Sequence, residues 1–297
     1  MNLNMLEVEK IVQKALEEDV GTGDITTALT IPPGSFSHAK IVAKESGVIA
    51  GLEVASVVFD LAVKCCGYKS TLQTKCQTQN SPNGICFQAT LQDGSEVKAG
   101  DIVAEIEGDT AVILTAERTA LNFLQRMSGI ATQTAKLVRL VSHTKAQIVD
   151  TRKTTPGLRI LEKYAVRVGG GRNHRFGLYD AVLIKDNHIQ AAGGIEKAIR
   201  AARAKVPHTV KIEVEADTIE HVKQALEAGA DMILLDNMPL DTLRQAVKLC
   251  QGRALTEASG GITEENIVEI AESGVDLISV GAITHSVKAL DLSLDIV

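Results

Sequence analysis

The second half of the chain repeats a strand-and-helix unit at a nearly constant spacing. Short apolar runs end at Glu215, Asp236, Ser259 and Gly281, at intervals of 21, 23 and 22 residues, and an amphipathic stretch lies between successive runs. Apolar strands that alternate with helices form a parallel sheet, because a parallel pair of strands needs a crossover connection. Such regular spacing favours an α/β barrel over an open Rossmann-type sheet.

Six apolar strands are expected in this half, and amphipathic helices follow four of them. A short run at Val166–Val168 is a candidate for a seventh strand. Because eight strands are not visible, the barrel is expected to be open. The strands are expected at residues 146–149, 181–184, 210–214, 232–235, 254–258 and 277–280, and the helices at residues 194–205, 218–228, 240–249 and 264–273.

The first half of the chain has a different texture, with short alternating runs that are typical of antiparallel strands. We expect helices over residues 5–18 and 54–63, with a turn-rich loop over residues 19–27. Two longer helical patterns follow, at residues 110–127 and 132–141. The change of texture near residue 145 indicates two domains. The antiparallel strands are expected at residues 39–44, 47–50, 84–89 and 102–107.

Aromatic side chains are scarce, with five Phe, three Tyr and no Trp among 297 residues. The core must therefore be built from Ala, Val, Ile and Leu. This composition argues against a protein that stacks nucleic-acid bases or sugar rings on aromatic side chains. The net charge of −6 also argues against a dedicated nucleic-acid binder.

Neither the start of the chain nor its apolar runs indicate export or membrane insertion. No positively charged segment with an apolar run opens the chain, and no run approaches the roughly 18 apolar residues that span a bilayer. We therefore expect a cytoplasmic protein with no membrane partner. Four of the five cysteines cluster without the C-x2-C spacing of a zinc site, so free thiols on a surface loop are favoured over a structural metal; they are Cys65, Cys66, Cys76 and Cys86.

Polar and charged residues follow the apolar strands where each strand ends, which is where α/β barrels carry their chemistry. The window from Asp150 to His188 holds eight basic and four acidic residues, so it is charged +4 in a chain whose remainder is −10. A cationic pocket in an acidic protein attracts a small polyanionic substrate, and Arg matches two carboxylate or phosphate oxygens at once. The polar residues at the strand ends are Asp150–Lys153, Lys185–His188, Glu213, Glu215, Asp236, Asn237, Glu257 and Ser259.

Two glycine-containing loops are candidates for binding a phosphate group. Ser259 and Gly260 end one strand and precede Thr263, a good N-cap residue for the next helix. Gly281 ends the following strand. Loops on the last two strands form the usual phosphate site of such barrels, so we expect a phosphate between them.

A pair of carboxylates is expected beside this phosphate site. Glu215 and Asp236 lie at the ends of neighbouring strands, and Glu215 shares one face of its strand with Glu213 and Lys211. Glu215 is the better candidate of the two glutamates, because it is nearest the strand end. Paired carboxylates in such a place suit Mg²⁺, and they suit ribose hydroxyls equally well.

A series of motifs, in order along nearly the whole chain, resembles the quinolinate phosphoribosyltransferases, the carboxylating nicotinate-nucleotide pyrophosphorylases. The clear departure is the polar, cysteine-containing stretch at residues 65–88, which looks like an enlarged loop away from the chemistry. The motifs are Glu18–Thr26, Glu117–Asn122, Asp150–Arg159, Gly169–Arg175, Lys185–His188, Glu213–Glu215, Leu235–Asn237 and Glu257–Ile262.

The resemblance implies an α/β protein of two domains. An N-terminal α/β sandwich would cover residues 1–128, with the C-terminal tail 286–297 packed back on it, and an open α/β barrel of about seven strands would cover residues 129–285. The family forms homodimers or hexamers in which the neighbouring subunit completes each site, and Arg118 would be the donated residue. The reaction implied converts quinolinate and phosphoribosyl pyrophosphate to nicotinate mononucleotide, pyrophosphate and CO2, with Mg²⁺, in NAD biosynthesis.

The resemblance also assigns roles to individual residues. Quinolinate carries two carboxylates, so cations hold it: Arg152, His174, Arg175, Lys185 and the neighbour's Arg118. The implied catalytic residues are Lys153 and Lys185, which face phosphoryl oxygens, and Glu215 and Asp236, which bind the ribose hydroxyls and Mg²⁺. The residues around the 5′-phosphate are Ser259, Gly260, Gly281 and His285.

Two other functions remain as alternatives. A sister pyrophosphorylase on the same fold would act on another base such as nicotinate, and the number of cations in the base pocket distinguishes it from an enzyme for a dianion. Residues 93–106 resemble half of a biotinyl or lipoyl carrier domain. A carrier needs a lysine at an exposed hairpin tip, usually between small or Met residues. No Met-Lys-Met sequence is present.

Overall fold

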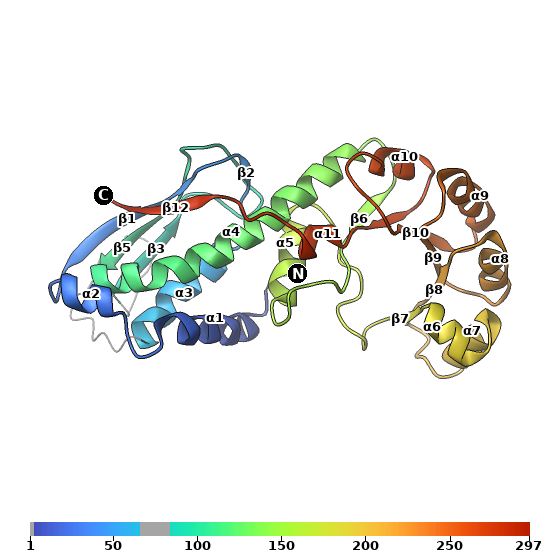
Figure 1. Ribbon diagram of the computed structural model, residues 1–297, viewed down its shortest axis with the longest axis horizontal. Coiled ribbons are helices and arrows are strands. Elements are labelled where there is room, and N and C mark those ends of the chain that lie inside the picture. The colour runs from blue at the N-terminus through green and yellow to red at the C-terminus, as the bar shows by residue number, and fades with distance from the viewer. Residues whose placement is uncertain (1–2, 66–83) are drawn as a thin grey trace. The chain divides into compact units, whose positions relative to one another are not determined.

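The computed structural model describes residues 3–65 and 84–297, which form two compact units (Figure 1). Unit 1 comprises Met1–Gln133, Thr155–Gly169 and Val287–Val297, and unit 2 comprises Thr134–Thr154 and Gly170–Ser286. The expected boundary after residue 128 falls at residue 133 in this division. Residues 155–169, which were expected in the barrel, belong to unit 1.

Unit 1 is built on a four-stranded antiparallel sheet in the order β12-β1-β5-β3, with helices α1, α3 and α4 on one face (Figure 1). Ala39, Ile41 and Ala43 alternate along β1 and are buried on the helix side, where Ile106 of β5 pairs with Ala39. The core is aliphatic, as expected from the composition. The strands are β1 (Phe36–Ala43), β2 (Gly47–Val48), β3 (Ile85–Ala89), β4 (Glu96–Val97), β5 (Ile102–Asp109) and β12 (Leu292–Ile296).

The helices of unit 1 differ from the expected ones in three places. A short helix occupies part of the expected loop at residues 19–27, because the Asp24 side chain accepts a hydrogen bond from the Thr27 backbone N–H at 3.0 Å and caps it. A long helix replaces the two expected at residues 110–127 and 132–141. The expected strand at residues 166–168 is wrong, because these residues end a helix. The helices are α1 (Met5–Val20), α2 (Ile25–Thr30), α3 (Leu52–Cys65), α4 (Thr110–Leu140, which continues into unit 2) and α5 (Arg159–Val168).

Local packing explains why α4 continues through Ser128 and Gly129. A Cβ atom on Gly129 would overlap the backbone carbonyl oxygen of Lys288 and lie 3.0 Å from Cα of Ala289. The glycine therefore lets the C-terminal segment pass close to the helix, and β12 then pairs with β1. The Ser128 hydroxyl accepts a hydrogen bond from the backbone N–H of Ala50 at 3.0 Å. The short gap expected between the two helices is therefore part of one continuous helix, and its residues form tertiary contacts.

The segment that resembled a carrier domain is an integral part of unit 1. Strand β5 pairs with both β1 and β3. Asp93 accepts hydrogen bonds from the backbone N–H groups of Gly51 and Leu52, at 2.9 and 3.1 Å, and from the Tyr164 hydroxyl at 2.7 Å. A swinging carrier module would not be tied into the sheet in this way.

Most of the cysteine-containing stretch at residues 65–88 lies outside the described residues. Cys86, on β3, is described and forms a disulfide. The expectation of a free thiol is therefore wrong for Cys86.

Unit 2 carries the six-stranded parallel sheet, in the order β6-β11-β10-β9-β8-β7. All six expected apolar strands are confirmed, and the barrel is open because β6 and β7 are the two ends of the order. A single parallel bridge between Val149 and Arg172 marks a rudimentary seventh position beside β6. The strands are β6 (Gln147–Val149), β7 (Val182–Ile184), β8 (Ile212–Ala216), β9 (Met232–Asp236), β10 (Leu255–Ser259) and β11 (Leu277–Ser279).

Helices connect these strands at the expected places, and two short helices, α6 and α11, add to them. Helix α10 begins three residues later than its sequence indicates. Asn266, and not Thr263, is its N-cap, and the Asn266 side chain accepts from the Thr263 backbone N–H at 2.8 Å. No helix in the described part of the chain is both long and apolar enough to cross a membrane. The helices of unit 2 are α6 (Asp186–Ala192), α7 (Ile195–Arg203), α8 (Ile219–Glu227), α9 (Leu240–Cys250), α10 (Ile267–Glu272) and α11 (Ala282–His285).

Candidate active site

The carboxyl ends of the unit 2 strands surround a cavity of about 650 Å³. Every predicted site residue except Arg118 lines it. The polar strand ends therefore converge on one site, as the barrel prediction requires. These predicted residues are Arg152, Lys153, His174, Arg175, Lys185, Glu215, Asp236, Ser259, Gly260, Gly281 and His285.

Two guanidinium groups lie near each other in this cavity. Partial burial lowers the pKa of Arg175, and the positive charge of Arg152 lowers it further. Like charges held together in a half-buried site repel each other, and an anion that binds between them relieves this repulsion. The Arg175 guanidinium also donates to the carbonyl oxygen of Ala181 at 3.2 Å. These residues form a prepared site for a carboxylate or a phosphate.

Asp150 fixes the segment that presents His174 and Arg175, although sequence reasoning assigned it no role. It is fully buried at the end of β6. Its carboxylate accepts hydrogen bonds from the Asn173 side chain at 2.5 Å and from the His174 backbone N–H at 2.9 Å. The position of Asp150 directly after an apolar strand indicated that it lies at the site. The sequence did not indicate that its side chain is buried.

The two predicted carboxylates lie together, with Lys185 beside them. Glu215 Oε2 is 3.6 Å from Lys185 Nζ. Burial raises the pKa of Glu215, Lys185 lowers it, and the charges of Asp236 and Asp186 raise it further. Lys185 is half exposed, so it is available to a ligand as well as to Glu215. Burial and like charge therefore disfavour the ionised form of Glu215 in the protein alone.

The glycine loops lie beside these carboxylates. Ser259 pairs with Asp236 in the parallel register of β10 and β9. Asn237 adopts a left-handed backbone conformation with φ of 51° and donates from its side chain to Asp236 at 2.7 Å. A Cβ atom on Gly260 would overlap the Asn237 side chain. The close packing between the two strand ends therefore requires glycine at position 260.

Lys153 and His285 converge on the second glycine. A Cβ atom on Gly281 would lie 3.1 Å from Cδ of Lys153 and 3.2 Å from Cδ2 of His285. The Thr284 hydroxyl donates to the Lys153 carbonyl oxygen at 2.8 Å, which ties the loop after β6 to α11. A lysine and a histidine beside a glycine loop at the last strands suit a phosphate group.

Arg118 belongs to unit 1, whereas the residues that line the cavity belong to unit 2. It lies on α4 in unit 1, its side chain is 59% exposed, and its nearest acidic partner is Glu117 at 3.8 Å. It does not line the cavity. A donated residue would be exposed in the free chain, so its role stays a prediction.

Sequence reasoning did not predict that Glu213 and Glu257 would contact His174. His174 Nε2 lies 3.0 Å from Glu213 Oε2 and 3.7 Å from Glu257 Oε2 inside the barrel. The alternation with Glu215 along β8 was a signal for Glu213, and that with Ser259 along β10 was one for Glu257. Neither pattern shows that the two side chains meet.

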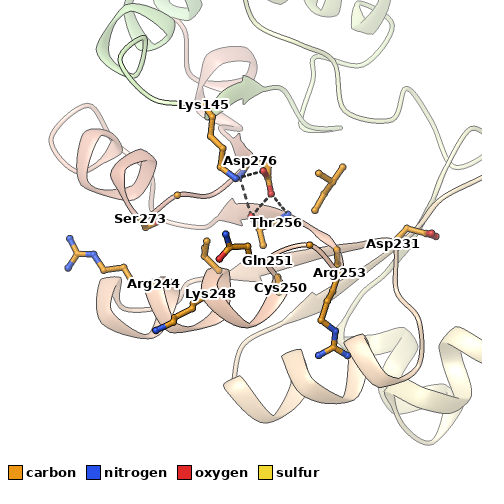
Figure 2. Close-up of a pocket in the computed structure, with 15 residues that line it drawn as sticks. Lys145, Asp231, Arg244, Lys248, Cys250, Gln251, Arg253, Thr256, Ser273 and Asp276 are labelled. Carbon is orange, nitrogen blue, oxygen red and sulfur yellow. Dashed lines mark hydrogen bonds and ion pairs between the residues drawn. The ribbon is translucent and has the colours of Figure 1, made fainter.

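The amino-terminal side of the same sheet has a second cavity, of about 640 Å³ (Figure 2). Here Lys145 Nζ points to Asp276 Oδ1 at 2.6 Å, and Asp276 also accepts from Thr256. Arg244 and Arg253 point in different directions and do not converge (Figure 2). This cavity therefore lacks the arrangement of a charged ligand site.

The fold and the cavity define a class: an open α/β barrel that binds a small polyanion at the carboxyl ends of its strands. Matches to family models identify the family. The model of the quinolinate phosphoribosyl transferase C-terminal domain matches residues 130–295, and that of the N-terminal domain matches residues 24–128. The chain belongs to the quinolinate phosphoribosyltransferase family.

Curated relatives agree along the whole chain. A probable nicotinate-nucleotide pyrophosphorylase (carboxylating) of Bacillus subtilis is 45% identical over 294 residues, which cover 99% of this chain and 95% of the relative. The nicotinate-nucleotide pyrophosphorylase (carboxylating) of Mycobacterium leprae is 44% identical over 289 residues, which cover 96% of this chain and 95% of the relative.

Solved structures share the fold. The nicotinate-nucleotide pyrophosphorylase of Francisella tularensis has a TM-score of 0.89 at 40% identity, with 100% of this chain and 98% of that chain covered. NadC of Streptococcus pyogenes also has a TM-score of 0.89 at 40% identity, with 100% and 99% covered. The human nicotinic acid phosphoribosyltransferase has a TM-score of 0.62 at 14% identity, covers 97% of this chain and 74% of that chain, and shares the fold alone.

Proposed function

We propose that this protein is a quinolinate phosphoribosyltransferase. It converts quinolinate and phosphoribosyl pyrophosphate to nicotinate mononucleotide, pyrophosphate and CO2, in de novo NAD biosynthesis. The observation that carries the proposal is the cavity at the carboxyl ends of the strands, where Arg152, Arg175 and Lys185 lie beside an acidic pair and two glycine loops. Membership of the family and the names of its relatives support the same reaction.

The part of the cavity that receives quinolinate binds its two carboxylates with cationic side chains. Arg152 and Arg175 repel each other in the free protein, so an added dianion gains from both. Lys185 is half exposed beside Glu215 and offers a third positive charge. Arg118 of a neighbouring subunit completes the set. A monocarboxylate such as nicotinate would leave part of this charge unmatched, which disfavours it.

The phosphoribosyl site takes the sugar and its phosphate. Glu215 and Asp236 hold the ribose hydroxyls, and Lys153 faces phosphoryl oxygens. Lys185 also faces these oxygens, so it serves both substrates. The residues that surround the 5′-phosphate are Ser259, Gly260, Gly281 and His285.

The acidic pair also fits Mg²⁺. Carboxylate oxygens are its preferred protein ligands, and one or two carboxylates with substrate oxygens are a usual set. Burial and the neighbouring acidic charges raise the pKa of Glu215, and a bound cation would favour its ionised form. Glu215 and Asp236 would hold the ion. Its chemistry would be to neutralise charge on the pyrophosphate group.

The protein's part in the reaction is to orient and to screen charge. The bond between ribose C1 and the pyrophosphate oxygen breaks with its electron pair on oxygen, and the quinolinate nitrogen forms the new bond to C1. The resulting pyridinium then accepts the electron pair of the bond to the 2-carboxylate, CO2 leaves, and C2 takes a proton. Lys153 and Lys185 stabilise the leaving phosphoryl oxygens, and the acidic pair offsets positive charge at the ribose. No covalent nucleophile is needed.

The direct test is an assay with quinolinate and phosphoribosyl pyrophosphate that follows nicotinate mononucleotide, with nicotinate as the control base. We expect turnover with quinolinate and much weaker turnover with nicotinate. Equal turnover with the two bases would contradict the assignment and favour the sister pyrophosphorylase.

Shared sites are tested by mixing two inactive variants. Arg118→Ala should abolish activity and keep the fold, and Lys153→Ala should do the same from within the barrel. If the neighbouring subunit donates Arg118, mixed oligomers contain some sites with both residues intact, and part of the activity returns. No recovery in verified mixed oligomers would count against a shared site. The mass of the assembly in solution then separates a homodimer from a hexamer.

We also propose that the protein acts in the cytoplasm. The plant relatives carry organelle names, for example the mitochondrial quinolinate phosphoribosyltransferase (decarboxylating) 2 of Nicotiana glauca. Fractionation of cells that express the full chain would locate it, and recovery with membranes or organelles would contradict the proposal.

A further inference from the structure

A buried cluster inside the barrel includes two glutamates that have no task in the proposed reaction. It consists of His174, Glu213 and Glu257, which each offer an atom within 4.8 Å of the others. The side chains of Glu213 and Glu257 are only 6% and 1% exposed. His174 and Glu257 line the active-site cavity, and all three residues line a cavity of about 550 Å³ on the other side. The cluster therefore forms a partition between two cavities.

The two glutamates cannot both be ionised without further compensation. Among the described residues, no hydrogen-bond partner reaches Glu213 Oε1 or either oxygen of Glu257. Unpaired buried charge is costly, so a proton or a cation must complete the cluster. Burial and the neighbouring Glu213 carboxylate raise the pKa of Glu257, against the effect of His174. A proton on Glu257 would let it donate to Glu213 and would give both carboxyl groups a partner.

The hydrogen bonds of His174 distinguish a proton from a metal ion. Its Nδ1 accepts from the backbone N–H of Arg175 at 2.7 Å. A ring nitrogen that accepts carries no proton, so the proton of the neutral ring is on Nε2, which faces Glu213. A neutral imidazole that bound a metal through Nε2 would carry its proton on Nδ1, where the Arg175 N–H points. The geometry therefore favours a proton.

We propose that Glu213 and Glu257 are positioning residues that hold His174 as a neutral imidazole, and that His174 orients Arg175 rather than gripping a substrate carboxylate as a cation. Glu213 accepts the Nε2 proton, and protonated Glu257 donates to Glu213. Both ring nitrogens are then occupied by the protein. The role in substrate binding depends on the proposed function, whereas the state of the cluster does not.

This arrangement fixes Arg175 at two points. Its backbone N–H is bound to His174, and its guanidinium is bound to the Ala181 carbonyl oxygen. Binding a dianion then costs less ordering of the side chain, which favours affinity for the base. The buried glutamates would act on quinolinate only through His174 and Arg175.

The first test is ¹⁵N nuclear magnetic resonance of the full chain with labelled histidine. The protein has seven histidines, and His174→Gln identifies the signal. We expect the neutral Nε2–H form at pH 7, with and without quinolinate. An imidazolium ion or the Nδ1–H form in either state would overturn the proposal.

The second test compares two substitutions of one residue. Glu257→Leu removes the donor to Glu213, and we expect the KM for quinolinate to rise about tenfold. The KM for phosphoribosyl pyrophosphate and kcat should change less than about threefold, because the lost interaction acts on the base site alone. Glu257→Gln keeps a donor of the same shape, so it should restore most of the quinolinate affinity and keep the His174 signal.

Glu227→Gln, at the exposed end of α8, is the matched control and should behave as the unmodified protein. If Glu257→Gln is as damaging as Glu257→Leu, or changes the His174 signal, Glu257 is not a proton donor and the proposal fails. Should the Leu variant not fold, the signal of the Gln variant decides alone.

The third test addresses the metal ion. Elemental analysis and a Mn²⁺ titration of the substrate-free protein should show no ion at this cluster, so Glu257→Gln should not change the metal content. One ion per chain that Glu257→Gln removes would overturn the proposal. If quinolinate is not a substrate, the proposed function fails, and the resonance and metal measurements still decide the state of the cluster.

Discussion

The two ends of the barrel sheet carry similar residue types and use them differently. At the carboxyl end, Arg152 and Arg175 repel each other, and burial lowers the pKa of Arg175. Burial and the charges of Asp236 and Asp186 raise the pKa of Glu215, against the effect of Lys185. At the amino-terminal side, the partly exposed acids Asp276 and Asp231 have their partners within the chain.

Asp276 and Asp231 illustrate the second case. Burial acts to raise the pKa of Asp276, but hydrogen bonds from Lys145 and Thr256 outweigh it and hold the pKa below 3.8. Asp231 is held low in the same way by the Ile212 backbone N–H and by Arg203, against its burial. These carboxylates stabilise the fold, because their hydrogen bonds and ion pairs are made within the chain.

The difference teaches that charge by itself does not mark a site in this protein. Lys248 and Arg253 line a cavity as large as the active-site cavity, but they point apart (Figure 2). What distinguishes the active end is that cations and carboxylates converge on one cavity, whereas Lys248 and Arg253 point apart.

The largest effect should follow from removing a converging cation. Arg175→Ala is expected to lower kcat/KM for quinolinate about 100-fold or more, because it leaves a buried substrate carboxylate without its partner. The free energy of unfolding should not fall, since the repulsion with Arg152 is also removed. Steady-state kinetics and urea unfolding check both parts. A loss below threefold would place the carboxylates elsewhere.

A matched change at the other end should affect stability and not activity. Asp276→Asn weakens hydrogen bonds to the Thr256 backbone N–H at 2.9 Å and hydroxyl at 2.8 Å, and to Lys145. We expect the free energy of unfolding to fall by about 2 kcal/mol at pH 7, with kcat/KM within about twofold of the unmodified protein. An activity loss like that of Arg175→Ala would break the distinction between the two ends.

The same variant should show a pH dependence of defined sign. Because the folded-state pKa of Asp276 lies below its ordinary 3.8, its contribution is full above the unfolded pKa and is lost as the pH falls through the folded value. The stability difference between the protein and Asp276→Asn should therefore be constant above about pH 5 and should shrink in more acidic solution. A difference that grows on acidification would have the wrong sign.

The smallest effect on activity and stability is expected from Arg253, whose side chain points away from the other cations of the second cavity (Figure 2). Arg253→Ala should change the free energy of unfolding by less than about 0.5 kcal/mol and leave kcat/KM for quinolinate unchanged. A loss of quinolinate turnover would show that the second cavity serves the reaction after all.

Periodicity predicts the barrel well, because buried strands and amphipathic helices follow the pattern of single segments. The site follows from it, since strand ends such as Glu215 and Asp236 must meet wherever parallel strands pair. Local patterns mislead where distant contacts decide. The sequence pattern divides α4 at residues 128–131, whereas Gly129 lets the tail at Lys288 pass close to one continuous helix.

Contacts between side chains inside the barrel also cannot be predicted from the sequence pattern. The run Val166–Val168 has the β-branched pattern of a strand, but it ends α5, where Leu161, Ala165 and Val166 are buried. Glu213 and Glu257 are 44 positions apart, and only the registers of β8, β9 and β10 bring them to His174. The strand ends of the predicted site line one cavity and their roles stay predictions, whereas the contact of His174 with Glu213 and Glu257 was not predicted.

The most direct test of the account is the ratio of kcat/KM for quinolinate to that for nicotinate, measured in the unmodified protein and in Arg175→Ala. If the converging cations at the carboxyl end recognise a dianion, the ratio is large and falls by at least about tenfold in the variant. A ratio near one, or a large ratio that Arg175→Ala leaves unchanged, would contradict it.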